Sequence, residues 1–154
     1  MAEYHPADEM RCPMHFCVGQ EAMPAALAQV LRRDDVLMSH YRSHGYYLAK
    51  GAPLDAMVAE FRARRDLVLK EVAKIDRLSA DRPSGAFYVF PKVDVRLDSA
   101  TLCERILKEA SVAVTPGSAF GEAGEGHIRI SYAASRETIT EGVRRIGEVL
   151  AKLG

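Results

Sequence analysis

The C-terminal two thirds of the chain alternate between strand-like and helix-like patterns of apolar residues. Three short runs of apolar, aromatic and β-branched residues are bounded by turns and predict strands over 86–91, 112–115 and 127–133. Two further segments repeat apolar residues at helical spacing and predict helices over 98–110 and 135–153. Asp98 or Ser99 is suited to cap the first of these helices, and Ser135 the second. The order of the elements predicts an α+β fold, with a small three-strand sheet covered by helices on one face.

The N-terminal third carries helical patterns of its own. Segment 20–33 has helix formers around an apolar stripe, and a second helical pattern begins at Pro53 and continues to about Leu78. Between them, segment 36–41 is compatible with a short strand, and Ser43-His44-Gly45 with a turn. The sequence therefore predicts a helical N-terminal segment and a long linking helix in front of the sheet.

Composition and charge exclude several classes of partner. The 154 residues include 21 Lys+Arg and 21 Asp+Glu, so the formal net charge is zero, whereas a duplex-binding protein normally has a basic excess. No apolar run approaches the length of a membrane span, and the N-terminal stretch MAEYHPADEM lacks the basic and apolar parts of a leader. The 3 cysteines are not spaced like a disulfide framework. We expect a cytoplasmic protein that binds neither nucleic acid nor membrane.

Five cysteine and histidine residues between positions 12 and 44 are potential metal ligands. They are Cys12, His15, Cys17, His40 and His44. Two cysteines separated by four residues, with one pair of histidines, fit no standard zinc ligand spacing. We therefore predict no metal site, and a structural Zn²⁺ is the alternative that measurement of the metal content would test.

Three motifs in the C-terminal part resemble those of class I pyridoxal-phosphate aminotransferases. The segments 85–91 (GAFYVFP), 112–121 (VAVTPGSAFG) and 126–133 (GHIRISYA) occur in the order of that family and with similar spacing. The preceding segment 61–68 resembles the helix that leads into the family's small C-terminal domain. The resemblance implies that 61–154 form a small α+β domain, which in the family closes over the substrate.

Arg129 is the candidate site residue of this part. In a strand over 127–133 it faces the same side as Ser131, opposite Ile128 and Ile130. A guanidinium on a rigid strand is well suited to bind a carboxylate through two hydrogen bonds. The resemblance implies that Arg129 grips the α-carboxylate of an amino acid or 2-oxo acid. A surface arginine on a half-exposed strand is the alternative.

The rest of the aminotransferase machinery is not recognisable in the chain. The family forms a Schiff base between pyridoxal phosphate and a lysine of a large domain that precedes this region. The six lysines of this chain lie in helices, at a strand end or beside Gly51, and none is in the family's Ser-x-x-Lys-like setting. The family's asparagine near the cofactor ring has no counterpart, because the chain contains no Asn. We therefore predict no catalytic residue and no cofactor held by this chain alone.

The first 60 residues resemble a different family. Segments 13–22, 35–45 and 48–51 resemble the alpha subunit of thiamine-diphosphate-dependent 2-oxo acid dehydrogenases of the pyruvate or acetoin type. The resemblance implies that Tyr41 and Arg42 correspond to a pair that reaches the cofactor diphosphate. The family's Mg²⁺-binding motif, which begins Gly-Asp-Gly and ends Asn-Asn, is absent, so a diphosphate site here would be vestigial.

Together the two resemblances predict a chimera of 1–60 and 61–154, joined inside one helix. A natural fusion and an engineered recombinant would have the same sequence features. We predict a folded homo-oligomer without stand-alone catalysis, because amphipathic helices separated from their parent partners expose apolar area. Pyridoxal-phosphate-dependent aminotransferase activity assembled with another chain is the alternative.

Overall fold

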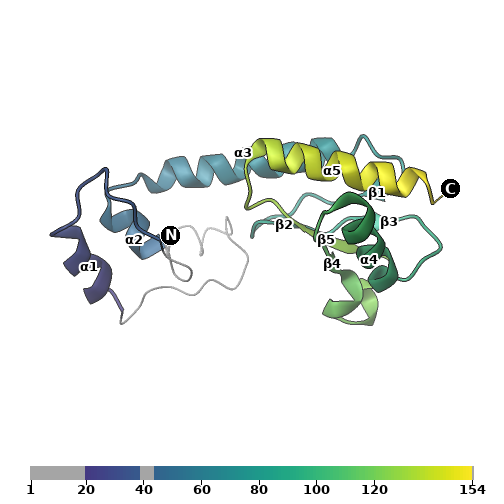
Figure 1. The fold of residues 1–154 in the computed structure, drawn as a ribbon, viewed down its shortest axis with the longest axis horizontal. Helices are drawn as coiled ribbons and strands as arrows, with labels where there is room; N and C mark the ends of the chain where they lie inside the picture. The colour runs from purple at the N-terminus through teal and green to yellow at the C-terminus, as the bar shows by residue number, and fades with distance from the viewer. Residues whose placement is uncertain (1–19, 39–43, 154) are drawn as a thin grey trace.

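A computed structural model of the chain describes residues 20–38 and 44–153. The described residues of the N-terminal part form three helices, α1 (Ala22–Ala28), α2 (His44–Ala49) and α3 (Leu54–Val72). Helices α1 and α2 lie at one end of α3, and the small sheet lies at the other end (Figure 1). Helix α3 is therefore the connection between the two parts, as the sequence predicted.

The sheet has three antiparallel strands with the last strand in the centre. It consists of β2 (Tyr88–Val89), β5 (Ile128–Ser131) and β4 (Thr115–Pro116), in the order β2-β5-β4. In this register Val89 lies opposite Ile130, and Thr115 lies opposite Arg129. Strands β2 and β5 lie within the segments expected at 86–91 and 127–133, whereas β4 overlaps the segment expected at 112–115 only at Thr115. The arrangement confirms the α+β class.

Two helices follow the predicted boundaries closely. Helix α4 (Ser99–Ala110) begins after Asp98, whose side chain accepts a hydrogen bond of 2.9 Å from the Thr101 amide. Helix α5 (Arg136–Ala151) begins after Ser135, whose hydroxyl accepts one of 3.2 Å from the Thr138 amide. Each cap satisfies one of the amides that a helix start leaves without a partner. Of the two candidates at the start of α4, Asp98 is the cap, and the prediction for Ser135 is confirmed.

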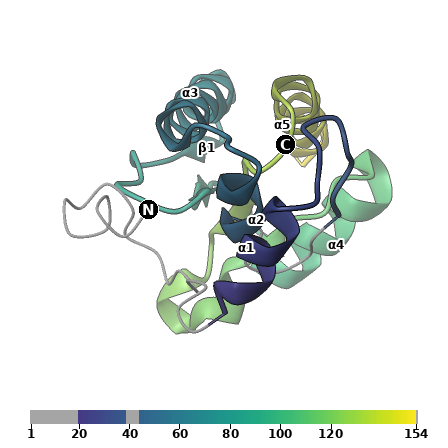
Figure 2. The ribbon, with the colours of Figure 1, turned by 90° about the vertical axis from the view of Figure 1, so that its left-hand side faces the viewer.

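The core forms where α3, α4 and α5 meet one face of the sheet. Helices α3 and α5 lie alongside each other on the same side of the strands (Figures 1 and 2). Burial of each large aliphatic side chain stabilises the fold by about 1.5–3 kcal/mol. The most deeply buried members, at 0 or 1% exposure, are Val68, Val72, Val89, Leu102, Ile106, Ile128, Ile146 and Leu150.

Several local expectations were wrong. Helix α3 ends at Val72 rather than near Leu78, because Leu78 pairs with Val93 in an additional two-stranded sheet, β1 (Leu78–Ser79) with β3 (Lys92–Val93). The turn expected at Ser43-His44-Gly45 is the start of α2 from His44 onward. Residues 36–38 form no strand.

Among the described helices, none is long and apolar enough to cross a membrane.

Candidate carboxylate-binding site

Strand β5 places Arg129 on the face of the sheet opposite the core. Ile128 and Ile130 on either side of it are buried, at 0 and 8% exposure, whereas Arg129 is half-buried. Side chains alternate between the two faces of a strand, so the guanidinium points away from the core. The orientation predicted for Arg129 is confirmed.

Two aromatic rings and one hydroxyl group hold the guanidinium. Arg129 Nη2 donates a hydrogen bond of 3.3 Å to Oγ1 of Thr115, its cross-strand partner on β4. The guanidinium carbon lies 4.3 Å from the ring centroid of Tyr88 and 4.7 Å from that of Phe120. Tyr88 belongs to β2 and Phe120 follows β4, so the rings reach Arg129 from elements on opposite sides of β5. Each cation–π contact stabilises this arrangement by about 0.5–1 kcal/mol.

Within residues 20–38 and 44–153 the Arg129 guanidinium has no carboxylate partner. Its one hydrogen bond there uses one of its N–H donors, and the remaining donors have no acceptor in the described part. Other arginines differ: Arg105 pairs with Glu109 at 2.6 Å. A fixed guanidinium with unused N–H groups in its plane is chemically suited to a planar carboxylate.

Aromatic surface continues from Arg129 along the same side of the domain. Phe90 packs edge-to-face on Phe120, with centroids 5.8 Å apart, and stacks on His127 at 5.1 Å with an interplanar angle of 6°. Phe90 and Phe120 are 38% and 52% exposed, so this surface is open to solvent. A ligand with its carboxylate on Arg129 would therefore find apolar surface beside it.

Sequence reasoning identified Arg129 but not the residues that hold it. Tyr88 and Phe90 alternate with buried Val89, so their outward orientation could be read from the strand pattern. Their proximity to Arg129 depends on the β2–β5 register, which the strand segments alone do not define. Phe120 lies in the motif over 112–121 but follows no strand or helix periodicity, because it ends a short 3₁₀ helix in a loop.

That loop is closely packed where it leaves the sheet. The 3₁₀ helix η1 (Gly117–Phe120) is followed by a second, η2 (Glu122–Gly124). A Cβ on Gly117 would lie 1.9 Å from the carbonyl oxygen of Gly124, so the two backbones approach too closely for any side chain there. The Gly117 amide donates a hydrogen bond of 2.8 Å to the His127 carbonyl, which ties the loop to the start of β5.

The loop is also joined to the N-terminus of α4 through Glu125. Its carboxylate accepts hydrogen bonds from the amide of Ser99 at 2.6 Å, the hydroxyl of Ser99 at 3.0 Å and the amide of Gly126 at 3.1 Å. The hydrogen bonds from the Gly126 and Ser99 amides lower the pKa of the Glu125 carboxyl. The group is therefore a carboxylate at neutral pH.

The remaining predicted residues can be placed only in part. Tyr41 and Arg42, expected to lie at a vestigial diphosphate site, are outside the described residues. Of the five potential metal ligands, only His44 is described, and it lies in α2. In the described ranges, no three His, Cys, Asp or Glu side chains are grouped so that they could hold a metal ion.

The lysines, all in described residues, do not offer a site for pyridoxal phosphate. Lys74 and Lys108 pair with helix neighbours, and Lys152 lies 3.7 Å from Glu109. Lys50 donates to the Asp35 carbonyl, and the remaining two lysines, Lys70 and Lys92, are exposed. A Schiff-base lysine is normally activated by a desolvated or cationic environment, which these positions lack. The lysines of the described part therefore do not fit this cofactor.

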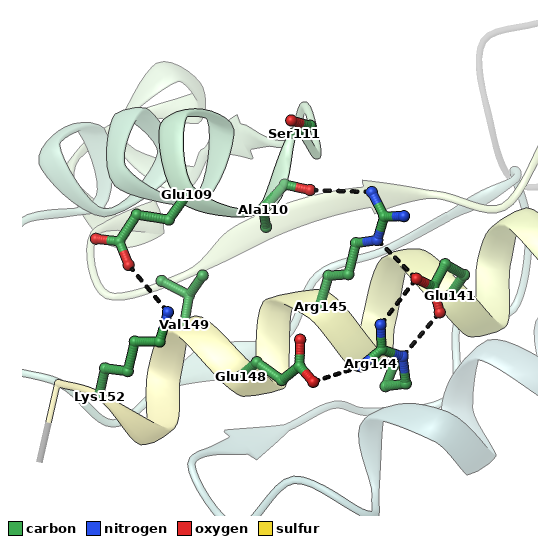
Figure 3. Close-up of a pocket in the computed structure, with 9 residues that line it drawn as sticks. All are labelled: Glu109, Ala110, Ser111, Glu141, Arg144, Arg145, Glu148, Val149 and Lys152. Atoms are coloured by element: carbon green, nitrogen blue, oxygen red, sulfur yellow. Dashed lines mark hydrogen bonds and ion pairs between the residues drawn. The ribbon is translucent and has the colours of Figure 1, made fainter.

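A charged hollow lies between the C-terminal end of α4 and α5 (Figure 3). It has a volume of about 260 Å³ and is lined mainly by charged side chains. Glu141 accepts hydrogen bonds from both Arg144 and Arg145, and Arg144 also pairs with Glu148. Because its charges neutralise one another, this hollow offers no unpaired group comparable to Arg129.

Comparison with known proteins identifies the family. Residues 8–146 match the family model for aminotransferase class I and II. This chain belongs to the class I and II aminotransferase family. The chain is 45% identical over 98 residues to aromatic-amino-acid aminotransferase 2 of Thermococcus litoralis, and 46% identical over 98 residues to an aspartate aminotransferase of Pyrococcus abyssi.

The similarity covers most of this aminotransferase-family chain but a small part of its relatives. Each of the two alignments covers 63% of this chain and 25% of the relative, so the chain spans about a quarter of those proteins. An LL-diaminopimelate aminotransferase of Maridesulfovibrio salexigens is 32% identical over 145 residues, which are 90% of this chain and 36% of that protein. The crystal structure of an aromatic aminotransferase from Pyrococcus horikoshii superposes with a TM-score of 0.61 at 42% identity, covering 71% of this chain and 28% of that one.

The family match also bears on the predicted junction. It begins at residue 8 and extends across residues 60 and 61, where the sequence analysis expected two parent enzymes to meet. The aminotransferase origin of the C-terminal part is confirmed. None of the comparisons described above supports a thiamine-diphosphate dehydrogenase segment.

Proposed function

We propose that this chain is an aminotransferase small-domain unit that binds the carboxylate of an amino or 2-oxo acid at Arg129 and does not catalyse transamination alone. The observation that carries the proposal is the Arg129 guanidinium, which is fixed by Tyr88 and Phe120 but has no acid partner in the described residues. Membership of the aminotransferase family favours a substrate carboxylate as the anion that this group would bind.

Titration with a small carboxylate tests the binding. We expect succinate to shift the backbone amide resonances of β5 in a saturable way in the unmodified chain. Arg129→Ala should abolish this shift, and Arg129→Lys should weaken the binding, because an ammonium group keeps the charge but loses the planar fork. Arg105→Ala, at an arginine already paired with Glu109, is the matched control and should bind like the unmodified chain. Equal binding by the Arg129→Ala variant would contradict the proposal.

An assay with pyridoxal phosphate tests the absence of stand-alone catalysis. We expect L-aspartate and 2-oxoglutarate to give no more product with the chain than with free cofactor, because no lysine is placed to form the Schiff base. The alternative is activity assembled with another chain that supplies the cofactor-binding lysine. Product that appears only when such a chain is added, and that depends on Arg129, would support this alternative.

For residues 11–60 we propose a thiamine-diphosphate dehydrogenase origin, with Tyr41 and Arg42 as a vestigial diphosphate site. The alignment with the Thermococcus litoralis enzyme covers 63% of the chain, so a segment of other origin is compatible with it. The match to the aminotransferase family model begins at residue 8 and argues against such a segment. Titration with thiamine diphosphate and Mg²⁺ tests the site. Binding that is lost in Arg42→Ala would support it, and no binding by the unmodified chain would remove the functional part of this proposal.

Self-association is proposed for the full chain. Val30 and Val36 near α1 are 74% and 89% exposed, and Met38 is 93% exposed. Apolar side chains gathered at one end of a molecule favour contact with a second copy. Sedimentation velocity over a wide concentration range should show an oligomer, and Val36→Asp should weaken it. A strictly monomeric chain would refute this part of the proposal.

A further inference from the structure

Phe120 differs from the other groups at Arg129 in how it is held. Tyr88 and Thr115 lie in strands whose pairing with β5 sets their positions. Phe120 instead ends η1 and is followed by Gly121, which has a φ of 109°. The position of the Phe120 ring on the guanidinium therefore depends on what fixes η1.

Two sets of contacts fix η1, at consecutive residues. At Gly117, the hydrogen bond to His127 and the close approach to Gly124 hold the backbone. At Ser118, both the amide and the hydroxyl meet the hydroxyl of Ser99, at 3.2 Å and 2.9 Å. Ser99 is 1% exposed, so its hydroxyl is a buried and stationary partner.

The direction of these hydrogen bonds follows from the number of protons. Ser99 has one hydroxyl hydrogen and two acceptors within reach, the Glu125 carboxylate at 3.0 Å and Ser118 Oγ at 2.9 Å. Donation to the charged oxygen is the stronger bond, so the Ser99 hydroxyl donates to Glu125. The same proton is shared with Ser118 Oγ at 2.9 Å, and Ser99 Oγ accepts a hydrogen bond of 3.2 Å from the Ser118 amide. Ser99 therefore bridges Ser118 and the carboxylate.

We propose that Ser99 and Glu125 are positioning residues for the Arg129 site, which hold Ser118 and thereby keep the ring of Phe120 on the guanidinium. Neither residue contacts Arg129 in the structure. The carboxylate sets the orientation of the Ser99 hydroxyl, the hydroxyl fixes Ser118, and η1 carries the constraint two residues further to Phe120. The position of the Phe120 ring does not depend on the proposed function. Only the expected effect of Ser99 and Glu125 on ligand binding rests on that function.

The Arg129 Nε–H resonance provides a test that needs no ligand. Aromatic rings shift the resonances of protons close to their faces, so Phe120→Ala defines the position of this signal without the Phe120 ring. We expect Ser99→Ala to move the signal toward that position, because it removes the bridge but leaves the Ser99 amide to Glu125. Glu125→Ala should do the same, and Glu125→Gln should restore much of the unmodified position, because its amide group can still bond to Ser99 Oγ. Glu122→Ala, in the adjacent 3₁₀ helix η2, is the control.

Succinate affinity is the second readout. Loss of one hydrogen bond of about 0.5–1.5 kcal/mol corresponds to binding that is about 2- to 10-fold weaker in Ser99→Ala. If the Nε–H signal stays at its unmodified position in both Ser99→Ala and Glu125→Ala, the positioning role is refuted, even if succinate binds at Arg129. If Arg129→Ala leaves succinate binding unchanged, the proposed function fails while the resonance test still stands. Should Ser99→Ala, at a residue that is 1% exposed, unfold the domain, Glu125→Ala at an exposed position carries the test alone, and an unmoved signal there refutes the role.

Discussion

The hydroxyl of Tyr132 donates a hydrogen bond of 2.8 Å to the backbone carbonyl of Ala86, 46 positions earlier in the chain. Tyr132 is 2% exposed, and Ala86 has a φ of 62°, in the left-handed region that non-glycine residues rarely occupy. The bond joins the end of β5 to the turn that leads into β2. It therefore helps to set the position of Tyr88, two residues beyond Ala86.

Removal of this hydroxyl should destabilise the domain. We expect Tyr132→Phe to lower the free energy of unfolding by about 0.5–1.5 kcal/mol, because it leaves the half-buried Ala86 carbonyl without that donor. Urea denaturation at pH 7 measures the change. Tyr88→Phe, at a more exposed ring, is the matched control and should change the stability by less than about 0.5 kcal/mol. A Tyr132→Phe variant as stable as the unmodified protein would show that water replaces the hydroxyl.

Glycine at position 86 should have the opposite effect. A non-glycine residue in the left-handed region costs about 1–2 kcal/mol, whereas glycine costs about 0.5–1 kcal/mol in additional chain entropy. We therefore expect Ala86→Gly to be neutral or to stabilise the protein by up to about 1 kcal/mol. Ala59→Gly, at an exposed position inside α3, should instead destabilise by about 1 kcal/mol. Equal losses at both positions would argue against strain at Ala86.

Gly117 should not tolerate even a methyl group. Its Cβ would overlap the backbone of Gly124, which cannot move as a flexible side chain can. We expect Gly117→Ala to destabilise the domain by about 3 kcal/mol, and to displace η1 with Phe120. Gly142→Ala, inside α5 with its nearest neighbour at 4.0 Å, should be neutral or stabilising by up to about 1 kcal/mol. Thermal unfolding of the two variants compares them directly.

The link between α3 and α5 should depend on pH. Arg136 and Arg64 donate hydrogen bonds to Glu60, at 2.6 Å and 2.8 Å, and lower the pKa of its carboxyl from 4.5 to about 2. Because the folded-state pKa is the lower one, the stabilisation is complete above pH 4.5 and is lost as the pH falls toward 2.

The variant Glu60→Gln tests this dependence. It should be less stable than the unmodified protein at pH 7, and the difference should shrink between pH 4.5 and 2. These side chains are partly exposed, so 1 M salt should also reduce the difference. A difference that persists unchanged at pH 2 would assign the effect to packing of the side chain rather than to its charge.

Local signals in the sequence predicted more of this fold than long-range ones. The caps Asp98 and Ser135 were correct because a cap depends on amides only three residues away. Strand β1 was missed because two residues are too few to show a period, and Leu78 happens to continue the helical spacing of α3. The same holds for the site. Arg129 could be predicted from its strand and its motif. Its contact with Phe120 could not, because it depends on a loop whose Ser118 is hydrogen-bonded to Ser99, 19 positions earlier.

The pairing of α3 with α5 has a consequence for how the chain folds during synthesis. Glu60 and Arg136, which join these helices, are 76 positions apart. While the ribosome is still producing the segments between them, Val68 and Val72 on α3 lack the partners that α5 supplies, and long-range closures of this kind fold slowly. The nascent chain therefore exposes the apolar stripe of α3 until α5 emerges, and this interval is when a chaperone would be needed most.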